Sequence, residues 1–108
     1  MPDVVAAGDL VELTPAWESH VYPVSALLIE KMKLDGRMWK GNLPSYIFGA
    51  GTMGVVVSYE FDFLRNQTVF AIEFHIEKFQ RSGGGRDRSD SIDKRVVLFS
   101  REGFQQAG

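Results

Sequence analysis

The feature that most constrains this chain is a pair of alternating runs near its middle. From Val55 to Phe63 every second residue is large and apolar, and the same alternation returns from Phe70 to Ile76. A strict period of two, rich in β-branched and aromatic residues, is typical of half-buried strands. Because the connection Leu64-Arg65-Asn66-Gln67 is short, the two runs predict a long β-hairpin. The second run leaves one polar face that is expected to point to water, formed by Ala71, Glu73, His75 and Glu77.

Two further strands are predicted around this hairpin. Arg81 to Asp93 is rich in Gly, Arg, Asp and Ser and indicates a loop. The apolar run from Arg95 to Ser100 then predicts a third strand, which would complete an antiparallel meander. Near the start, Gly8 to Thr14 also alternates, with Leu10 and either Glu12 or the pair Val11 and Leu13 facing inward.

The segment from Pro23 to Leu43 fits two structures. Ser25 can cap a short helix from Ala26 to Leu34 that ends at Gly36. The stretch from Lys31 to Lys40 contains Asp-Gly, which equally suits a tight hairpin turn. The helix is slightly favoured, and the hairpin stays open.

Composition limits the chain to one core. With 108 residues, 44% of them hydrophobic and 24% charged, a single domain over residues 1–108 is expected. The absence of cysteine excludes disulfides, thiolate metal sites and a cysteine nucleophile. No signal peptide and no membrane span is apparent, so we expect a cytoplasmic protein, or one within a virion, without a membrane partner. A sheet of four or five strands hides its edges best by curling, so we predict a mainly β fold: a small antiparallel barrel or β-roll with a long first loop and at most one short helix.

Four short motifs resemble those of the small SH3-like barrels, including their KOW-type versions. Gly8-Asp9-Leu10-Val11 resembles their opening strand, and Gly51 to Val57 resembles the strand after their first loop. Val69 to Phe74 and Val96 to Phe99 resemble the following strand and the closing strand. The connection of about forty residues after the first strand is longer than in a KOW module. With its long loops and no cysteine, the chain is also similar to small virion components such as phage head-to-tail connector or neck proteins.

No catalytic, cofactor-binding or metal-binding residue is predicted. Gly49 to Gly54 matches the dinucleotide fingerprint letter for letter, but a strand follows it where that motif needs a helix, so a turn or bulge is expected. Glu73, His75 and Glu77 share one strand face and could bind a metal with His20, yet exposed polar alternation explains them equally well. No nucleophile stands beside a base, and we expect a protein that is not an enzyme.

The candidate partner-binding residues are basic or aromatic. The chain is acidic in its first twenty residues and basic from Lys78 to Arg101. Such an asymmetry is most often a solvated face, but it also suits contacts between subunits or with an anionic partner. We therefore expect a structural, non-enzymatic subunit of a larger protein assembly, homo-oligomeric or mixed. A nucleic-acid-binding regulator of KOW or SH3-like type is the alternative. The residues expected to make contacts are Arg81, Arg86, Arg88, Lys94, Arg95, Trp17 and Trp39.

Overall fold

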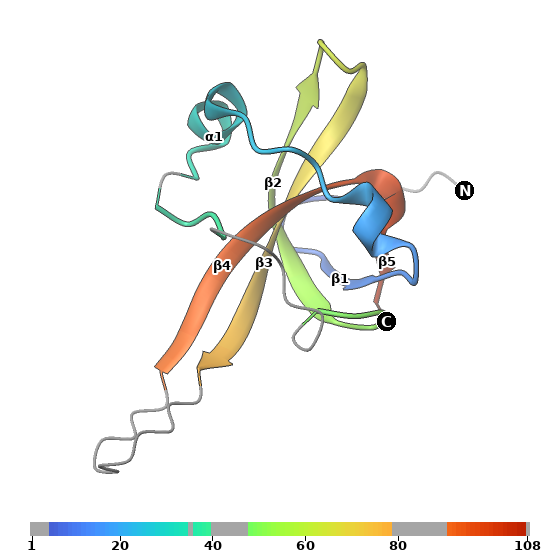
Figure 1. Ribbon diagram of the computed structural model, residues 1–108, viewed down its shortest axis with the longest axis vertical. Helices are drawn as coiled ribbons and strands as arrows, with labels where there is room; N and C mark the ends of the chain where they lie inside the picture. The colour runs from blue at the N-terminus through green and yellow to red at the C-terminus, as the bar shows by residue number, and fades with distance from the viewer. Residues whose placement is uncertain (1–4, 35, 40–47, 79–90, 108) are drawn as a thin grey trace.

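One twisted antiparallel sheet organises the protein (Figure 1). The computed structural model describes residues 5–34, 36–39, 48–78 and 91–107. The sheet has five strands in the order β4-β3-β2-β1-β5. Its strands are β1 (Leu10–Leu13), β2 (Met53–Asp62), β3 (Gln67–Lys78), β4 (Ser91–Ser100) and β5 (Phe104–Gln106). The helical elements are η1 (Trp17–His20), α1 (Ala26–Met32) and η2 (Arg101–Gly103).

The predicted hairpin and meander are confirmed. β2 pairs with β3 from Val55 opposite Glu73 to Asp62 opposite Gln67, and β4 pairs with β3 along its whole length. β4 begins at Ser91, so the last residues of the predicted loop, Ser91 to Asp93, belong to a strand. No helix within the described residues is long and apolar enough to cross a membrane.

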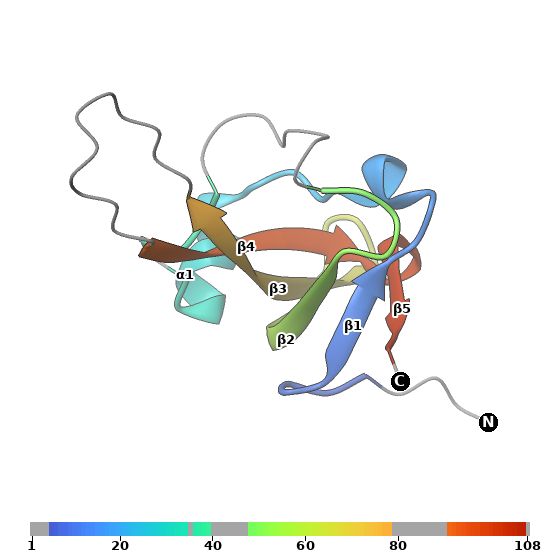
Figure 2. The same cartoon turned by 90° about the horizontal axis from the view of Figure 1, so that it is seen from below.

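The sheet curls because one short connection joins its two edges. The edge strands of a flat five-stranded sheet would lie about 19 Å apart, at about 4.8 Å per strand. β4 and β5 are those edge strands, yet only the three residues of η2 separate them, and a 3₁₀ turn rises only about 2 Å per residue. β1 and β5 therefore run at a steep angle to β3 and β4 (Figure 2). The predicted mainly β fold with one short helix is confirmed. Among the described residues no ladder joins β4 to β5, so of the two predicted forms the sheet is an open roll and not a closed barrel.

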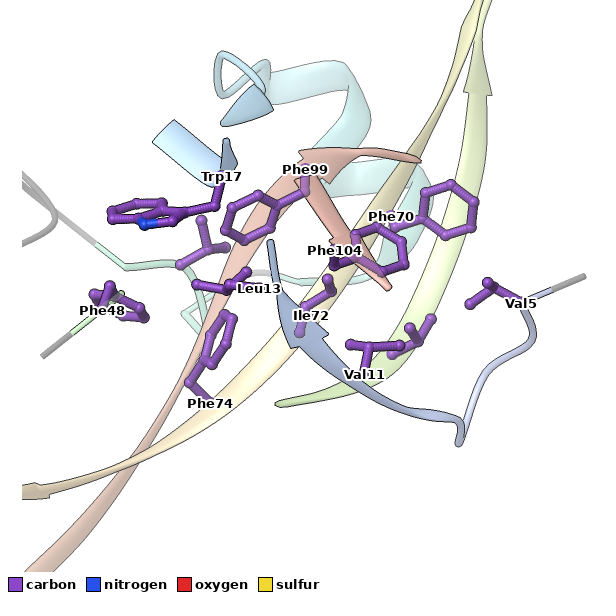
Figure 3. Close-up of a cluster of buried hydrophobic side chains, with 12 residues drawn as sticks. Val5, Val11, Leu13, Trp17, Phe48, Phe70, Ile72, Phe74, Phe99 and Phe104 are labelled. Carbon is purple, nitrogen blue, oxygen red and sulfur yellow. The ribbon is translucent and has the colours of Figure 1, made fainter. Parts of the chain in front are cut away.

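The hollow side of the roll holds an aromatic core (Figure 3). Phe70 packs edge-on against Phe104 with ring centres 5.1 Å apart, and Phe74 meets Phe48 in the same way at 5.1 Å. Such edge-to-face pairs are favourable beyond the area that they bury. The cluster comprises Val5, Val11, Leu13, Trp17, Phe48, Val56, Phe70, Ile72, Phe74, Val97, Phe99 and Phe104. Of the two faces expected for the first strand, the one with Val11 and Leu13 points inward.

A second core lies on the other face of the sheet, under α1, so the prediction that the chain forms only one core is wrong. Leu28 and Met32 of the helix pack there, and Ala71 is fully buried beneath them. β3 and β4 are consequently covered on both faces, and the prediction that the Ala71 face of β3 points to water is wrong at this level of the strand. The cluster comprises Tyr22, Leu28, Met32, Leu34, Met38, Val69, Ala71, Val96 and Leu98.

α1 settles the ambiguous segment in favour of a helix. The Ser25 hydroxyl accepts a hydrogen bond from the Leu28 amide, as expected of the predicted cap. The helix ends at Met32, before the predicted end at Leu34, and the left-handed residue that terminates it is Lys33 and not Gly36. The Lys33 amide bonds to the Glu30 carbonyl and the Leu34 amide to the Ile29 carbonyl, which together form a Schellman motif. Leu34 is buried in the second core and supplies the apolar contact of this motif, which ends the helix two residues before the predicted end.

The outer edge of β4 is covered by the long connection between β1 and β2. The Tyr22 amide donates to the Leu98 carbonyl at 2.8 Å, and the Trp39 amide donates to the Val96 carbonyl at 3.0 Å. The Val96 amide in turn donates to the Arg37 carbonyl at 2.8 Å. An uncovered edge strand invites pairing with other chains, so these bonds protect the apolar half of β4.

At Gly54 the curled sheet leaves no room for a side chain. This glycine pairs with Val11, and a Cβ atom there would lie 2.6 Å from Ile72 Cγ2 and 2.9 Å from Phe74 Cε1. Gly54→Ala should therefore lower the free energy of unfolding in urea by about 1–3 kcal/mol, the usual cost of overpacking. Gly49→Ala, where a Cβ would meet nothing within 4 Å, is the control and should change it by less than about 0.5 kcal/mol. Equal effects of the two substitutions would contradict this packing.

Candidate interaction surface

A bulge in β2 decides which of its side chains face the core. Val56 pairs with Ile72 and Ser58 pairs with Ala71, so Val57 is the extra residue. The bulge brings Val56 onto the face of Tyr59 and Phe61 and turns Val57 toward the second core. The predicted grouping of Val55 and Val57 with Tyr59, Phe61 and Phe63 on one buried face is therefore wrong.

Beyond the bulge the apolar side chains of β2 are increasingly exposed to solvent. Val56 is fully buried, but Tyr59 is 51% exposed, and at the turn Phe63 and Leu64 are 79% and 93% exposed. The rings of Phe61 and Phe63 pack edge-on with centres 4.9 Å apart, and the Tyr59 ring lies 6.0 Å from that of Phe70. We call Tyr59, Phe61, Phe63 and Leu64 the hairpin tip; the β2–β3 turn lies at the top of Figure 1, beyond the rest of the sheet.

The exposed apolar area of the hairpin tip matches that of the largest apolar patch on a typical monomer. With about 200 Å² for each of these side chains, it amounts to roughly 500 Å². The largest apolar patch on a monomer is usually about 300–600 Å² and is often functional. The sequence signal for this surface is the pair Phe63-Leu64, because hairpin turns normally carry Gly, Asn, Asp or Ser.

Asp62 holds the turn in one conformation. Its Oδ1 accepts a hydrogen bond from the Leu64 amide at 3.0 Å, and its Oδ2 accepts one from the Tyr22 hydroxyl at 2.6 Å. The Arg65 guanidinium lies over the Tyr22 ring, 5.6 Å from its centre. Tyr22 is itself buried in the second core. The hairpin tip is thus tied to the body of the protein.

These contacts shift the ionisation of both partners. Burial, and then the hydrogen bond to Asp62, raises the pKa of Tyr22 to about 12. The hydrogen bond from Tyr22 is the main cause that holds the pKa of Asp62 below its ordinary value. The neutral phenol and the charged carboxylate are therefore the forms that the fold favours.

A groove of about 630 Å³ opens beside the hairpin tip. One wall is formed by the segment from Ser19 to Pro23, and the other by Arg65, Gln67 and Thr68. Ser100, Arg101 and Glu102, where β4 leaves the sheet, close its end. We call this space the Tyr22 groove.

The residues predicted to bind partners fall in different places. Arg81, Arg86 and Arg88 lie outside the described residues. Lys94 is exposed and pairs across the strands with His75, while Arg95, half-buried, is paired with Phe74.

The two predicted tryptophans lie at the core. Trp17 is buried with its ring 6.2 Å from that of Phe48, and Trp39 packs edge-on against the same ring at 5.5 Å. Trp17 is therefore a core residue in this structure, and Trp39 is half-buried at the rim of the aromatic cluster.

The chemical motifs weighed from the sequence have structural explanations. Glu73 forms an ion pair with Arg37, and His75 Nε2 lies 4.0 Å from its other oxygen. Within the described part of the chain no three His, Asp or Glu side chains gather as a metal site. The fingerprint glycines make the predicted turn into β2, where the Thr52 amide bonds to the Gly49 carbonyl and Gly51 has a φ of 89°.

Comparison with known proteins finds no relative: no family model, no curated protein and no solved structure matches this chain.

The bond between Tyr22 and Asp62 predicts a pH-dependent stability. Because the pKa of Asp62 is lowered, its contribution is present above about pH 4 and is lost as the pH falls through the lowered value. Because the pKa of Tyr22 is raised, its contribution is present below about pH 10 and is lost as the pH rises toward about 12. Tyr22→Phe should lower the urea midpoint at pH 7, and its difference from wild type should shrink toward pH 2 and pH 11.

Tyr59→Phe is the matched control, since Tyr59 is half exposed at the surface. Its urea midpoint should follow that of wild type at every pH. If the urea midpoint of Tyr22→Phe stayed below that of wild type by the same amount from pH 2 to pH 11, the ionisation described for this pair would be contradicted.

Proposed function

We propose that this protein is a non-enzymatic subunit of a larger protein assembly and that the hairpin tip contacts a neighbouring subunit. The observation that carries the proposal is the exposure of Phe63 and Leu64 at the end of a hairpin whose turn is held by Asp62. Exposed apolar side chains on a firmly held element suit binding, because little conformational entropy is lost when they are covered.

The energetics support a contact that extends beyond the hairpin tip. Burial of its roughly 500 Å² would contribute about 12 kcal/mol at 25 cal/mol per Å². Association itself costs about 4–15 kcal/mol, and a stable interface usually covers about 800 Å² on each partner. The tip therefore supplies the apolar centre of an interface, and adjacent polar surface completes it.

The resemblance to SH3-like barrels and to phage connector or neck proteins becomes part of this proposal. It is supported by the order of the elements: an opening strand, a long connection, a hairpin and a closing strand precede the short β5. Under the proposal the long connection serves as structure, because it supplies α1 and covers the edge of β4. A virion is the kind of assembly that the resemblance suggests.

Native mass spectrometry of the untagged protein at moderate salt tests the proposal. We expect a defined particle larger than the 12.1 kDa chain. Combining Phe63→Ser with Leu64→Ser should dissociate it, because truncation of a hot-spot residue at the centre of an interface costs about 2 kcal/mol or more. Combining Val24→Ser with Leu27→Ser, which removes two similarly apolar exposed side chains near α1, should leave the particle intact.

Two results would contradict the proposal in different ways. A wild-type chain that stays at 12.1 kDa at every concentration would contradict self-assembly through the tip. A particle that survives the tip substitutions would show that its contacts lie elsewhere, and the basic segment around Lys94 and Arg95 would then be tested for binding to nucleic acid.

A further inference from the structure

The Tyr22 groove lies along the turn and the first residues of β3, in the same hairpin as the tip. Arg65, on the wall of the groove, directly follows Leu64 in the chain. β4 pairs with β3 only as far as Ser100 opposite Val69, so Gln67 and Thr68 have no β4 residue beside them. Their backbone lies at the wall of the groove, where an extended segment could hydrogen-bond to it.

Two guanidinium groups of the groove lie over aromatic rings. Arg65 lies over the ring of Tyr22, and Arg101, at the closed end, lies over the ring of Phe104 with its Cζ 4.9 Å from the ring centre. Arg101 Nη1 also donates to the Phe104 carbonyl at 2.8 Å. Stacked arginines keep a rigid, planar set of donors that matches the geometry of a carboxylate.

The acidic groups near the groove are engaged or lie at its rim. Asp62 accepts the Tyr22 hydroxyl, and the side chain of Glu102 is 82% exposed, with Oε1 3.8 Å from His20 Nε2. His20 Nδ1 lies 3.1 Å from the Ser100 hydroxyl. The charged residues that line the groove are Arg65, Arg101 and Glu102. Asp62 interacts with Arg65 and offsets part of its charge.

We infer that the Tyr22 groove binds an extended acidic segment of the partner protein whose apolar side chains cover the hairpin tip. This inference rests on the proposed function, since it names the chemistry of the neighbour at the same surface. An aspartate or glutamate of the segment meets Arg65, a neighbouring apolar residue meets Phe63 or Leu64, and the segment backbone follows β3 at Gln67 and Thr68. The groove arginines would form ion pairs with the acidic residues of the segment, and the hairpin tip would bury its apolar residues.

A peptide titration followed by ¹⁵N–¹H NMR on the full chain tests this inference. The probe is the capped peptide acetyl-Asp-Phe-Glu-Leu-Asp-amide, and its matched partner carries Lys in place of each acidic residue. The acidic peptide should shift resonances of residues 19–23, 63–70 and 100–102, and the basic peptide should not. Arg65→Gln should raise the dissociation constant of the acidic peptide about tenfold, as expected for the loss of one charge-assisted hydrogen bond. Lys31→Gln, which removes one exposed positive charge from α1, should bind as wild type does.

Each other outcome overturns the inference. It is wrong if the acidic peptide shifts none of these resonances, if both peptides bind equally, or if Arg65→Gln binds as tightly as wild type. It is also wrong if a thymidine decamer shifts the same resonances at lower concentration, since the groove would then prefer phosphate. The proposed function is judged separately, because dissociation of the particle by the tip substitutions does not depend on any peptide.

Discussion

The three residues of η2 impose the constraint on which the rest of the structure depends. They carry the chain from β4, at one edge of the sheet, to β5, at the other. A flat sheet cannot satisfy so short a link, so the strands curl and enclose the rings of Phe70, Phe99 and Phe104. Gly54 permits the close approach of β2 to β3 that this curvature needs, because any Cβ there would meet Ile72 and Phe74.

The curl also accounts for the exposed surface. β1 pairs with β2 only at Met53, Gly54 and Val55, and the pairing of β4 with β3 ends at Val69. The far part of the β2–β3 hairpin therefore extends beyond its neighbouring strands, with apolar side chains still on the face that continues the core. The same early departure of β4 leaves room for the Tyr22 groove. The hairpin tip and the groove are thus two consequences of one topology, which is why we assign them to one partner.

The strands could be predicted from the sequence because their alternation is strong. The Ser25 cap could be predicted because it depends only on residues three positions apart in the chain. The second core could not be predicted, because the burial of Ala71 depends on where α1 docks, and the sequence of that segment allowed a hairpin as well. The bulge was hidden because Val55, Val56 and Val57 are apolar on both faces of the strand, so the pattern does not reveal which valine is the extra one. Without the bulge, Phe61 and Phe63 look like core residues. Of the residues predicted to bind partners, those in the Gly/Arg loop lie outside the described residues. The exposure of the hairpin tip, which carries the proposed function, was not predicted.

The central claim is that the hairpin tip is a binding surface and not part of the core, and equilibrium unfolding in urea tests it most directly. At a dilution at which native mass spectrometry shows the wild-type chain as a monomer, Phe63→Ser combined with Leu64→Ser should leave the free energy of unfolding within about 0.5 kcal/mol of wild type, as for surface positions. Phe70→Ala, at the nearest ring of the aromatic core, should lower it by about 3–5 kcal/mol. If the tip substitutions instead lowered it by several kcal/mol, Phe63 and Leu64 would be packed in the folded monomer, and the account of the tip as an interface would be wrong.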